Sequence, residues 1–282
     1  MKQKRVAAIH DISGFGKCSL TVALPILSAA GIECSCVPTA VLSTHTGGLS
    51  GYTYRDLTDD LPGFYRHWQA LGLEFDALYS GYLGSEAQLA IIADLFAALK
   101  GKDTLVLVDP VMGDNGALYT HFTPSFVRGM RHLVSQADLV IPNITEATHM
   151  LDMPYTSGPY TEEYIRGVLR SLTALGPKQA VLTGIALDDT RVGVATYTRA
   201  TDALHFALMP CVPGHYHGTG DVFGSALLGA LMHDNALEAA AHIAVEFTVQ
   251  SIQRTHAAGT DLRFGVNFEQ SLPGYMRALG CV

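Results

Sequence analysis

The sequence predicts an α/β protein of three layers, α/β/α, with a doubly wound and mostly parallel central sheet. Short apolar, β-branched runs alternate with longer helix-like segments along most of the 282 residues. The alternation then gives way to two facing strand patterns, Val192–Thr198 and Ala203–Met209, which predict a late antiparallel hairpin across Arg199–Asp202. No internal repeat or linker composition interrupts this order, so we expect a single domain over residues 1–282.

The strands are predicted from short runs rich in Val, Ile and Leu. They are expected at Val6–Ile9, Cys34–Val41, Tyr52–Leu57, Ala77–Ser80, Thr104–Val108, Leu139–Ile141 and Ala180–Thr183. Continuously apolar runs such as Thr104–Val108 are typical of parallel strands covered on both faces. Asp109-Pro110 and Pro142-Asn143 end two of these strands, and Gly184 is expected to end a third.

The helices are predicted from longer segments in which apolar residues recur at helical spacing. They are expected at Ser19–Ala30, Leu61–Leu71, Ser85–Leu99, Glu162–Leu175, Asp221–Met232 and Leu237–His256. Gly31 supplies a stop signal for the first helix, although Pro25 lies inside it. In a sheet of this kind, ligands bind beyond the carboxyl ends of the strands.

Composition excludes several classes of function. A chain with 48% hydrophobic and 16% charged residues is typical of a folded globule. The net charge is −8 and the basic residues are scattered, which disfavours nucleic-acid binding. No apolar run is long enough for a membrane span and Met1–Arg5 lead straight into a strand, so we expect a cytoplasmic protein. The five cysteines match no zinc spacing and are expected to be buried free thiols.

The turn Gly218-Thr219-Gly220-Asp221 enters an apolar run of small residues that predicts a helix. Glycines allow backbone N–H groups to approach an anion, and the start of the helix adds a positive dipole end. Asp221 would place a carboxylate beside this anion site, as deprotonation of an alcohol requires. Taken alone, the motif also fits an Asp N-cap behind a glycine-rich turn.

Polar motifs follow several other predicted strands. They are His10-Asp11-Ile12-Ser13-Gly14, Ser80-Gly81-Tyr82-Leu83-Gly84-Ser85, Asp109-Pro110-Val111-Met112-Gly113-Asp114 and Pro142-Asn143-Ile144-Thr145-Glu146. Each could be turn or cap chemistry, and Asn143 to Glu146 also has the spacing of a capping-box variant. Their shared place after strands favours one ligand site over separate turns.

Together these motifs resemble the ribokinase-like superfamily. The Asp109–Asp114 segment, Asn143-x-x-Glu146 and the Gly218–Asp221 turn look like its ATP-side motifs. Ser80–Ser85 and Ser43-Thr44-His45-Thr46-Gly47 resemble the vitamin B6 branch, the pyridoxal, pyridoxamine and pyridoxine kinases. The resemblance runs in order from about Val6 to His256.

The resemblance implies phosphorylation, by ATP, of the 5′-hydroxymethyl group of a B6 vitamer. Asp221 would take the alcohol proton, and the amides of Gly218, Thr219 and Gly220 would bind the γ-phosphoryl group. Asp109, Asp114 and Glu146 would hold Mg²⁺, whose preferred ligands are carboxylate oxygens and water. Asn143 would order the same network, and Thr183 is a candidate for contacting the phosphates or ribose of ATP.

On the acceptor side, the resemblance matches Thr46 and Tyr82 to positions that contact the pyridine ring, and His45 fits a ring contact or a loop histidine equally. Asp11 lies about where the family has a ring-contacting Ser, with Ser13 as its rival. A carboxylate there could bind a protonated ring nitrogen or an exocyclic amine. A homodimer is implied by the family alone, and the need for a monovalent cation is open.

Two departures keep alternatives open. The opening His10–Gly16 is closer to that of hydroxymethylpyrimidine kinases, which makes a hydroxymethylpyrimidine or hydroxymethylpyrimidine-phosphate kinase the second hypothesis. Sugar and nucleoside kinases of the same superfamily are a distant third. A non-catalytic B6- or nucleotide-binding protein is an alternative of a different class, although such a protein would not need Asp221. His215 and His217 lie two residues apart and hint at a metal, but without a third ligand they favour a cover over the substrate or plain packing.

Overall fold

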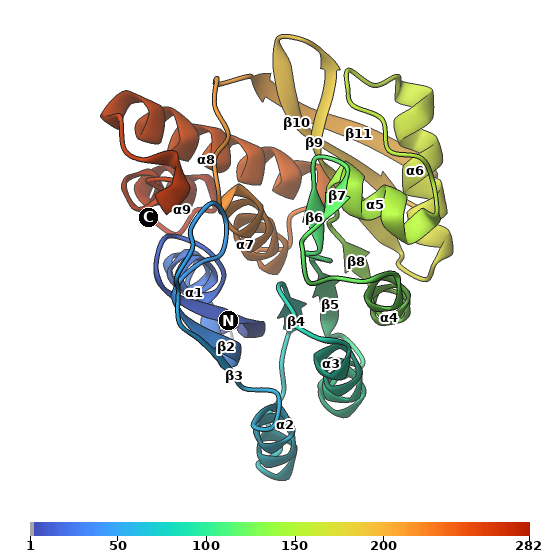
Figure 1. The fold of residues 1–282 in the computed structure, drawn as a ribbon, viewed down its shortest axis with the longest axis vertical. Coiled ribbons are helices and arrows are strands. Elements are labelled where there is room, and N and C mark those ends of the chain that lie inside the picture. The colour runs from blue at the N-terminus through green and yellow to red at the C-terminus, as the bar shows by residue number, and fades with distance from the viewer. Residues whose placement is uncertain (1–2) are drawn as a thin grey trace. The chain divides into compact units, whose positions relative to one another are not determined.

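The computed structural model describes residues 3–282, which form two compact units. The first unit combines residues 3–57 with Val212–Val282, and the second comprises Thr58–Cys211. Figure 1 labels the helices and strands of both units. The expectation of a single domain stays a prediction.

The first unit begins with β1 (Arg5–Phe15), α1 (Leu20–Ala29), β2 (Glu33–Thr44) and β3 (Tyr54–Asp56). β1 and β2 are parallel, and β3 pairs antiparallel with β2 from Ala40 to Leu42. The unit is completed by α7 (Thr219–Met232), α8 (Leu237–Ala258), the short helices η1 (Leu262–Phe264) and η2 (Glu269–Ser271), and α9 (Leu272–Ala278). Helices α7 and α8 pack side by side, and α1 packs on α7 and on both long strands (Figure 1).

The second unit carries the remaining elements. In chain order they are α2 (Leu61–Ala70), β4 (Ala77–Ser80), α3 (Glu86–Leu99), β5 (Leu105–Val108), β6 (Gly113–Asp114), β7 (Ala117–Leu118), α4 (Pro124–Val134), β8 (Leu139–Val140), α5 (Ile144–Leu151), α6 (Glu162–Ala174), β9 (Gln179–Asp188), β10 (Arg191–Thr198) and β11 (Ala203–Pro210). The strand order within this unit is β11-β10-β9-β8-β5-β4. Strands β4, β5, β8 and β9 are parallel, whereas β9, β10 and β11 are antiparallel neighbours. The predicted α/β class, mostly parallel with a late hairpin, is confirmed.

Long-range pairing explains two wrong strand ends. Strand β1 continues to Phe15, so that His10–Gly14 lies within a strand and not after one. Pairing with β2 extends it, with a register shift between His10 and Ile12. Strand β9 likewise passes Gly184, which has a φ of 68°, and reaches Asp188 because β10 pairs with it. Helices α4, α5 and α9, the short helices η1 and η2, and the small β6–β7 hairpin were not predicted.

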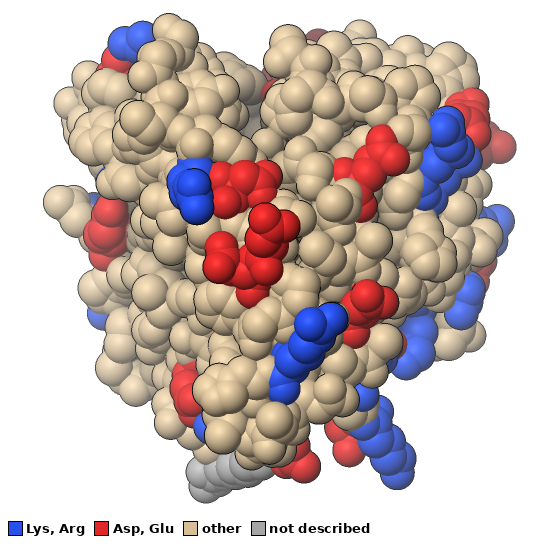
Figure 2. Space-filling model, turned by 60° about the horizontal axis from the view of Figure 1, so that its bottom comes forward, with Lys and Arg blue, Asp and Glu red and all other residues tan. Residues whose placement is uncertain are grey.

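Other expectations from composition can be compared with the described residues. No helix within residues 3–282 is long and apolar enough to cross a membrane. Figure 2 shows one face of the molecule on which Lys and Arg stand beside Asp and Glu and form no stripe. Cys18, Cys34, Cys36 and Cys281 are free thiols as expected. The prediction that the cysteines are buried was wrong, because these four are half-buried and Cys211 is exposed.

Candidate active site

In the first unit, the predicted anion site is formed by the start of α7. Gly218 is the N-cap residue, with φ 74° and ψ 2°. A Cβ at this position would lie 2.1 Å from the carbonyl oxygen of Lys17, so both the conformation and the space require glycine. The first helical hydrogen bond runs from Val222 N–H to Gly218 O at 3.1 Å. The first-turn N–H groups that precede it have no acceptor within the helix, and they point out of its positive end.

Asp221 belongs to the first turn of this helix and is not its N-cap, so the alternative of an Asp cap was wrong. Its side chain is only 15% exposed, and burial raises the pKa of Asp221 to about 7. The nearby Asp11 carboxylate also raises this pKa, while the Ser19 backbone N–H lowers it by hydrogen bonding. A carboxylate with a pKa near neutral pH is suited to general-base catalysis.

His10 lies beside Asp221, with 3.9 Å between its Nδ1 atom and Asp221 Oδ1. The His10 side chain is fully buried, and this burial lowers its pKa to about 3. The imidazole is therefore neutral near pH 7, and it does not offset the charge of the Asp221 carboxylate.

The two other residues predicted to contact substrate in this part of the chain, Asp11 and Ser13, are bonded to each other. Ser13 Oγ donates to Asp11 Oδ2 at 3.1 Å, and Ser19 Oγ donates to Asp11 Oδ1 at 2.5 Å. Asp11 and Ser13 are 5% and 0% exposed, respectively, which favours a structural task for both over direct contact with a ring. Ser19 was missed as a site residue. Its only signal was its place at the predicted start of α1.

Thr46 lies in the exposed loop that follows β2. Its neighbour His45 is buried, because its Nε2 atom bonds Arg263 O at 2.5 Å and its Nδ1 atom accepts from Gly47 N–H at 3.1 Å. The ring of His217 lies 5.7 Å from that of His45 and 5.0 Å from that of His215. No group of three or more His, Cys, Asp or Glu residues within 3–282 could hold a metal ion by itself. The histidines therefore form a ring cluster near Thr46.

In the second unit, Asn143 and Glu146 form a capping box at the start of α5. Asn143 Oδ1 accepts from Glu146 N–H and Glu146 Oε2 accepts from Asn143 N–H, both at 2.9 Å. The other carboxylate oxygen, Oε1, accepts from Met112 N–H at 3.2 Å. Burial raises the pKa of Glu146, while these N–H groups act to lower it. The capping interpretation and the family motif thus describe the same two residues.

The β6–β7 hairpin carries Asp114 and is clamped onto the start of α5. Its two-residue turn, Asn115-Gly116, has φ values of 51° and 82°, as a type I′ turn requires. Asn143 Nδ2 donates to Gly113 O, and Gly116 N–H donates to Thr145 Oγ1, both at 2.9 Å. The sequence analysis identified Asp109–Asp114 as a motif but predicted no strands in it.

Asp109 directly follows β5, and Thr183 lies within β9 of the same sheet. Asp109 is 7% exposed and donates its N–H to Ser80 O at 2.8 Å. Thr183 forms an isolated parallel bridge with Asn143, and its N–H donates to Pro142 O at 2.9 Å. The predicted residues Asp109, Asp114, Asn143, Glu146 and Thr183 therefore all belong to the second unit, on strands β6 and β9, at the start of α5 and directly after β5.

These residues fit a magnesium ion carried by a nucleotide. Asp109 and Asp114 supply hard carboxylate oxygens, and Mg²⁺ usually takes only one or two of these besides water and phosphate oxygens. The oxygens of Asp114 accept hydrogen bonds from Asn115, and those of Glu146 accept the N–H groups of Met112 and Asn143. Glu146 differs from Asp114 because it is buried, whereas Asp114 is half-buried. The geometry favours an ordering task for Glu146 over direct binding of the metal.

Tyr82 is half-buried in the loop after β4. Its hydroxyl bonds His121 Nε2 at 2.9 Å, and its ring lies 5.9 Å from that of Phe122. His121 was not singled out in the sequence, where nothing links it to Tyr82. The Tyr82 ring offers an aromatic face, and His121, whose ring is inclined at 71° to it, adds a polar edge, which suits a heteroaromatic ligand.

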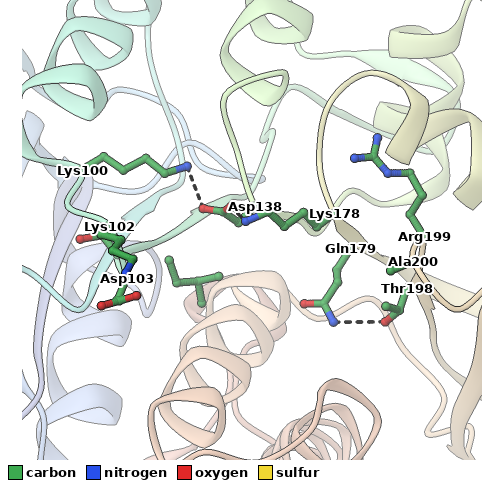
Figure 3. A pocket seen from close by; sticks show the side chains of 11 residues that line it. Lys100, Lys102, Asp103, Asp138, Lys178, Gln179, Thr198, Arg199 and Ala200 are labelled. Atoms are coloured by element: carbon green, nitrogen blue, oxygen red, sulfur yellow. Dashed lines mark hydrogen bonds and ion pairs between the residues drawn. The ribbon is translucent and has the colours of Figure 1, made fainter.

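A cavity of about 530 Å³ lies at the amino ends of β5, β8 and β9, at the opposite ends of the strands from these motifs (Figure 3). Asp138 lies between two lysines there, with Lys100 Nζ and Lys178 Nζ each 2.9 Å from one of its oxygens. None of the predicted site residues lines this cavity.

Comparisons with known proteins identify the family of the chain. A family model for phosphomethylpyrimidine kinase matches residues 27–265. The chain is 28% identical over 264 residues to the pyridoxine/pyridoxal/pyridoxamine kinase of Bordetella pertussis, and the match covers 90% of each chain. It is 40% identical to a Bacteroides thetaiotaomicron protein assigned to the phosphomethylpyrimidine kinases and crystallised with pyridoxal, with a TM-score of 0.92 over 97% of this chain and 96% of that one.

The pyridoxal kinase of Lactobacillus plantarum is 32% identical to the chain, with a TM-score of 0.89 and coverage of 98% of both chains. These matches span almost the whole sequence and confirm the resemblance to the ribokinase-like B6 kinases. The chain therefore belongs to the phosphomethylpyrimidine kinase family, in the branch that includes the pyridoxal kinases, and is an ATP-dependent kinase.

Proposed function

We propose that this kinase transfers the γ-phosphoryl group of ATP to the 5′-hydroxymethyl group of a B6 vitamer, namely pyridoxal, pyridoxamine or pyridoxine. One observation carries the proposal: Asp221, with its pKa raised to about 7, stands in the first turn of a helix whose N-cap must be glycine. This turn combines a base for an alcohol with an anion site for a phosphoryl group. The likeness to a structure that contains pyridoxal supports the choice of acceptor.

In this reaction Asp221 accepts the proton of the acceptor hydroxyl as its oxygen bonds to phosphorus. The amides of Gly218, Thr219 and Gly220 stabilise the charge on the transferred group. Phosphoryl transfer depends on positioning and charge stabilisation more than on covalent help from the protein. The neutral His10 leaves the Asp221 carboxylate without a cationic neighbour that would weaken it as a base.

The second unit supplies the nucleotide side of the reaction. Asp109 and Asp114 would hold Mg²⁺, directly or through water, and the ion would supply positive charge against the phosphates. Asn143 and Glu146 hold the loop of Met112 and the Gly113–Asp114 strand in place through the capping box and its extensions. Thr183, bridged to Asn143, contacts the phosphates or ribose.

For the acceptor, Tyr82 provides a flat surface for the pyridine ring and Thr46 a hydroxyl for a ring substituent. Asp11 and Ser13 have a structural task in the first unit, since Ser13 and Ser19 both donate hydrogen bonds to Asp11. We also propose that the protein is a homodimer located in the cytoplasm, where ATP is available. Analytical ultracentrifugation tests the dimer.

A second candidate is favoured by the family model, whose description is phosphomethylpyrimidine kinase. The opening His10–Gly16 is consistent with it. The purified protein should be incubated with Mg·ATP and each of pyridoxal, pyridoxamine, pyridoxine and hydroxymethylpyrimidine, in potassium and in sodium buffer, and ADP release followed. Turnover of a B6 vitamer without turnover of hydroxymethylpyrimidine is expected. The reverse pattern would establish the second candidate, and no turnover at all would favour a binding protein.

A further inference from the structure

Ser19 has a backbone conformation that residues with a side chain rarely adopt. Its φ is 59° and its ψ is −133°, directly before the first residue of α1. Conformations of this kind are strained and persist only where surrounding contacts impose them. Two contacts do so here: Ser19 Oγ donates to the buried Asp11 at 2.5 Å, and Ser19 forms a bridge with Ile12 of β1.

The backbone of the same residue reaches the proposed base. The Ser19 N–H donates a hydrogen bond to the Asp221 carboxylate. The neighbouring segment packs closely against the start of α7, where a Cβ on Gly218 would meet Lys17 O at 2.1 Å and Cys18 Sγ at 3.3 Å. One residue thus holds two carboxylates of the first unit, Asp11 through its hydroxyl and Asp221 through its amide.

We propose that Ser19 is a positioning residue for the base: Asp11 holds Ser19 in its left-handed conformation, and the Ser19 amide then orients the Asp221 carboxylate toward the acceptor hydroxyl. This inference rests on the proposed function and deepens it. It gives Asp11 a task within the protein, in place of a contact with the ring.

The groups around the two carboxylates predict the direction in which each substitution shifts the pKa of Asp221. Asp221 faces His10, which is neutral, as well as Asp11, Cys18 and the Ser19 amide. Asp11 faces Ser13, Ser19 and His45, and lies near Cys18 and Tyr54. The Ser19 amide lowers the pKa of Asp221, whereas the Asp11 charge raises it. Loss of the amide contact and loss of the charge should therefore shift the pKa of the base in opposite directions.

The first experiment is the pH profile of kcat for wild type, Ser19→Ala and Asp11→Asn. In Ser19→Ala the hydroxyl that holds the turn is gone. We expect kcat to fall about tenfold at an unchanged KM for ATP, with the ascending limb moved to higher pH. In Asp11→Asn the amide oxygen still accepts from Ser19 while the charge is lost, so the limb should move to lower pH.

Two further variants separate positioning from general stability. Ser19→Gly should lose less activity than Ser19→Ala, because glycine adopts a positive φ without strain. Ser28→Ala, at an exposed position of the same helix, is the matched control and should keep the wild-type profile. The proposal would be overturned if the ascending limb of the kcat–pH profile stays in place in Ser19→Ala. It would also be overturned if this limb moves in the same direction in Ser19→Ala and Asp11→Asn.

A readout without turnover keeps the two proposals apart. The ¹⁵N chemical shift of the Ser19 amide, followed by NMR between pH 5 and 9, should titrate with Asp221 and cease to do so in Asp221→Asn. A Ser19 amide that does not respond to this titration contradicts the inference even in an active kinase. A protein that phosphorylates no vitamer but shows the titration would instead contradict only the proposed function.

Discussion

In the second unit, the carboxylates at the two ends of β5, β8 and β9 have different bonding partners. At the amino ends, Asp138 is bracketed by Lys100 and Lys178, each 2.9 Å away (Figure 3). Burial alone would raise the pKa of Asp138, but the two lysines and the Val106 N–H hold it below its usual value. At the carboxyl ends, Glu146 is held by the backbone N–H groups of Met112 and Asn143.

This difference indicates that the amino ends of the strands have a structural role, whereas the carboxyl ends form the candidate site. A carboxylate paired with lysines is already neutralised, and it serves to fasten loops together. At the carboxyl ends, Glu146 is placed by backbone N–H groups, and Asp109 and Asp114 supply the carboxylates that a site for a magnesium nucleotide requires. Polar residues occur at both ends of these strands in the sequence. The bonding partners of each carboxylate, seen in the structure, distinguish the amino ends from the carboxyl ends.

The largest effect is expected from Asp221→Asn in the first unit. Removing the general base should lower kcat at least about a hundredfold while ATP binding is nearly unchanged. Initial rates and an ATP titration followed by calorimetry measure the two quantities. If turnover survives, Asp221 serves only the helix start.

The next test applies one chemical change to both ends of the sheet. Glu146→Gln and Asp138→Asn each exchange a carboxylate that accepts backbone N–H bonds for an amide, so each should lower the free energy of unfolding by about 1–3 kcal/mol. Only Glu146→Gln should also raise the KM for ATP, by about tenfold. Urea unfolding and steady-state kinetics provide the data. Equal kinetic losses in both variants would erase the distinction between the two ends.

A pair of glycines tests the anion turn in the same way. Gly218→Ala forces a side chain into a positive φ and against Lys17 O, and should destabilise the protein by about 2 kcal/mol. Gly220→Ala meets nothing within 4 Å in the described structure, and because alanine favours a helix more than glycine does, the free energy of unfolding should stay unchanged or rise slightly. Thermal unfolding compares the two variants. Equal midpoints would mean that Gly218 is not required by the turn.

The smallest effect is expected from Lys178→Gln. This lysine is 76% exposed, so its ion pair with Asp138 should contribute at most about 1 kcal/mol. The rate of phosphoryl transfer should stay at its wild-type value. A marked fall in kcat would show that the amino ends of the strands also take part in the reaction.

Local signals predicted the parts of the fold that depend on local structure. The apolar run Ala77–Ser80 is β4 with the same bounds, and the late hairpin followed from two alternating patterns around Arg199–Asp202. The turn at Gly218 was found because its glycines and its helix are contiguous. Helix α4 was missed although Thr123 and Pro124 give it a cap and a first residue, and α5 was missed because it is short and polar.

The parts that failed depend on distant partners. Nothing near His10–Ser13 indicates a strand, which exists because β2 pairs with it. Ser19 is a site residue only because its hydroxyl meets Asp11 and its amide meets Asp221, 202 positions along the chain (221 − 19). The bond between Tyr82 and His121 is of the same kind. Site residues that act through tertiary contacts leave no pattern of their own in a single sequence.

The central claim is that the Asp221 site phosphorylates a B6 vitamer, and a competition experiment tests it most directly. Pyridoxal and hydroxymethylpyrimidine at equal concentration are incubated in one tube with Mg·ATP and the wild-type protein, and the phosphorylated products are identified by mass spectrometry. Asp221→Asn is run in parallel. We predict that pyridoxal 5′-phosphate predominates and that the variant forms little of it. Predominant hydroxymethylpyrimidine phosphate, or equal product from the variant, would contradict the account.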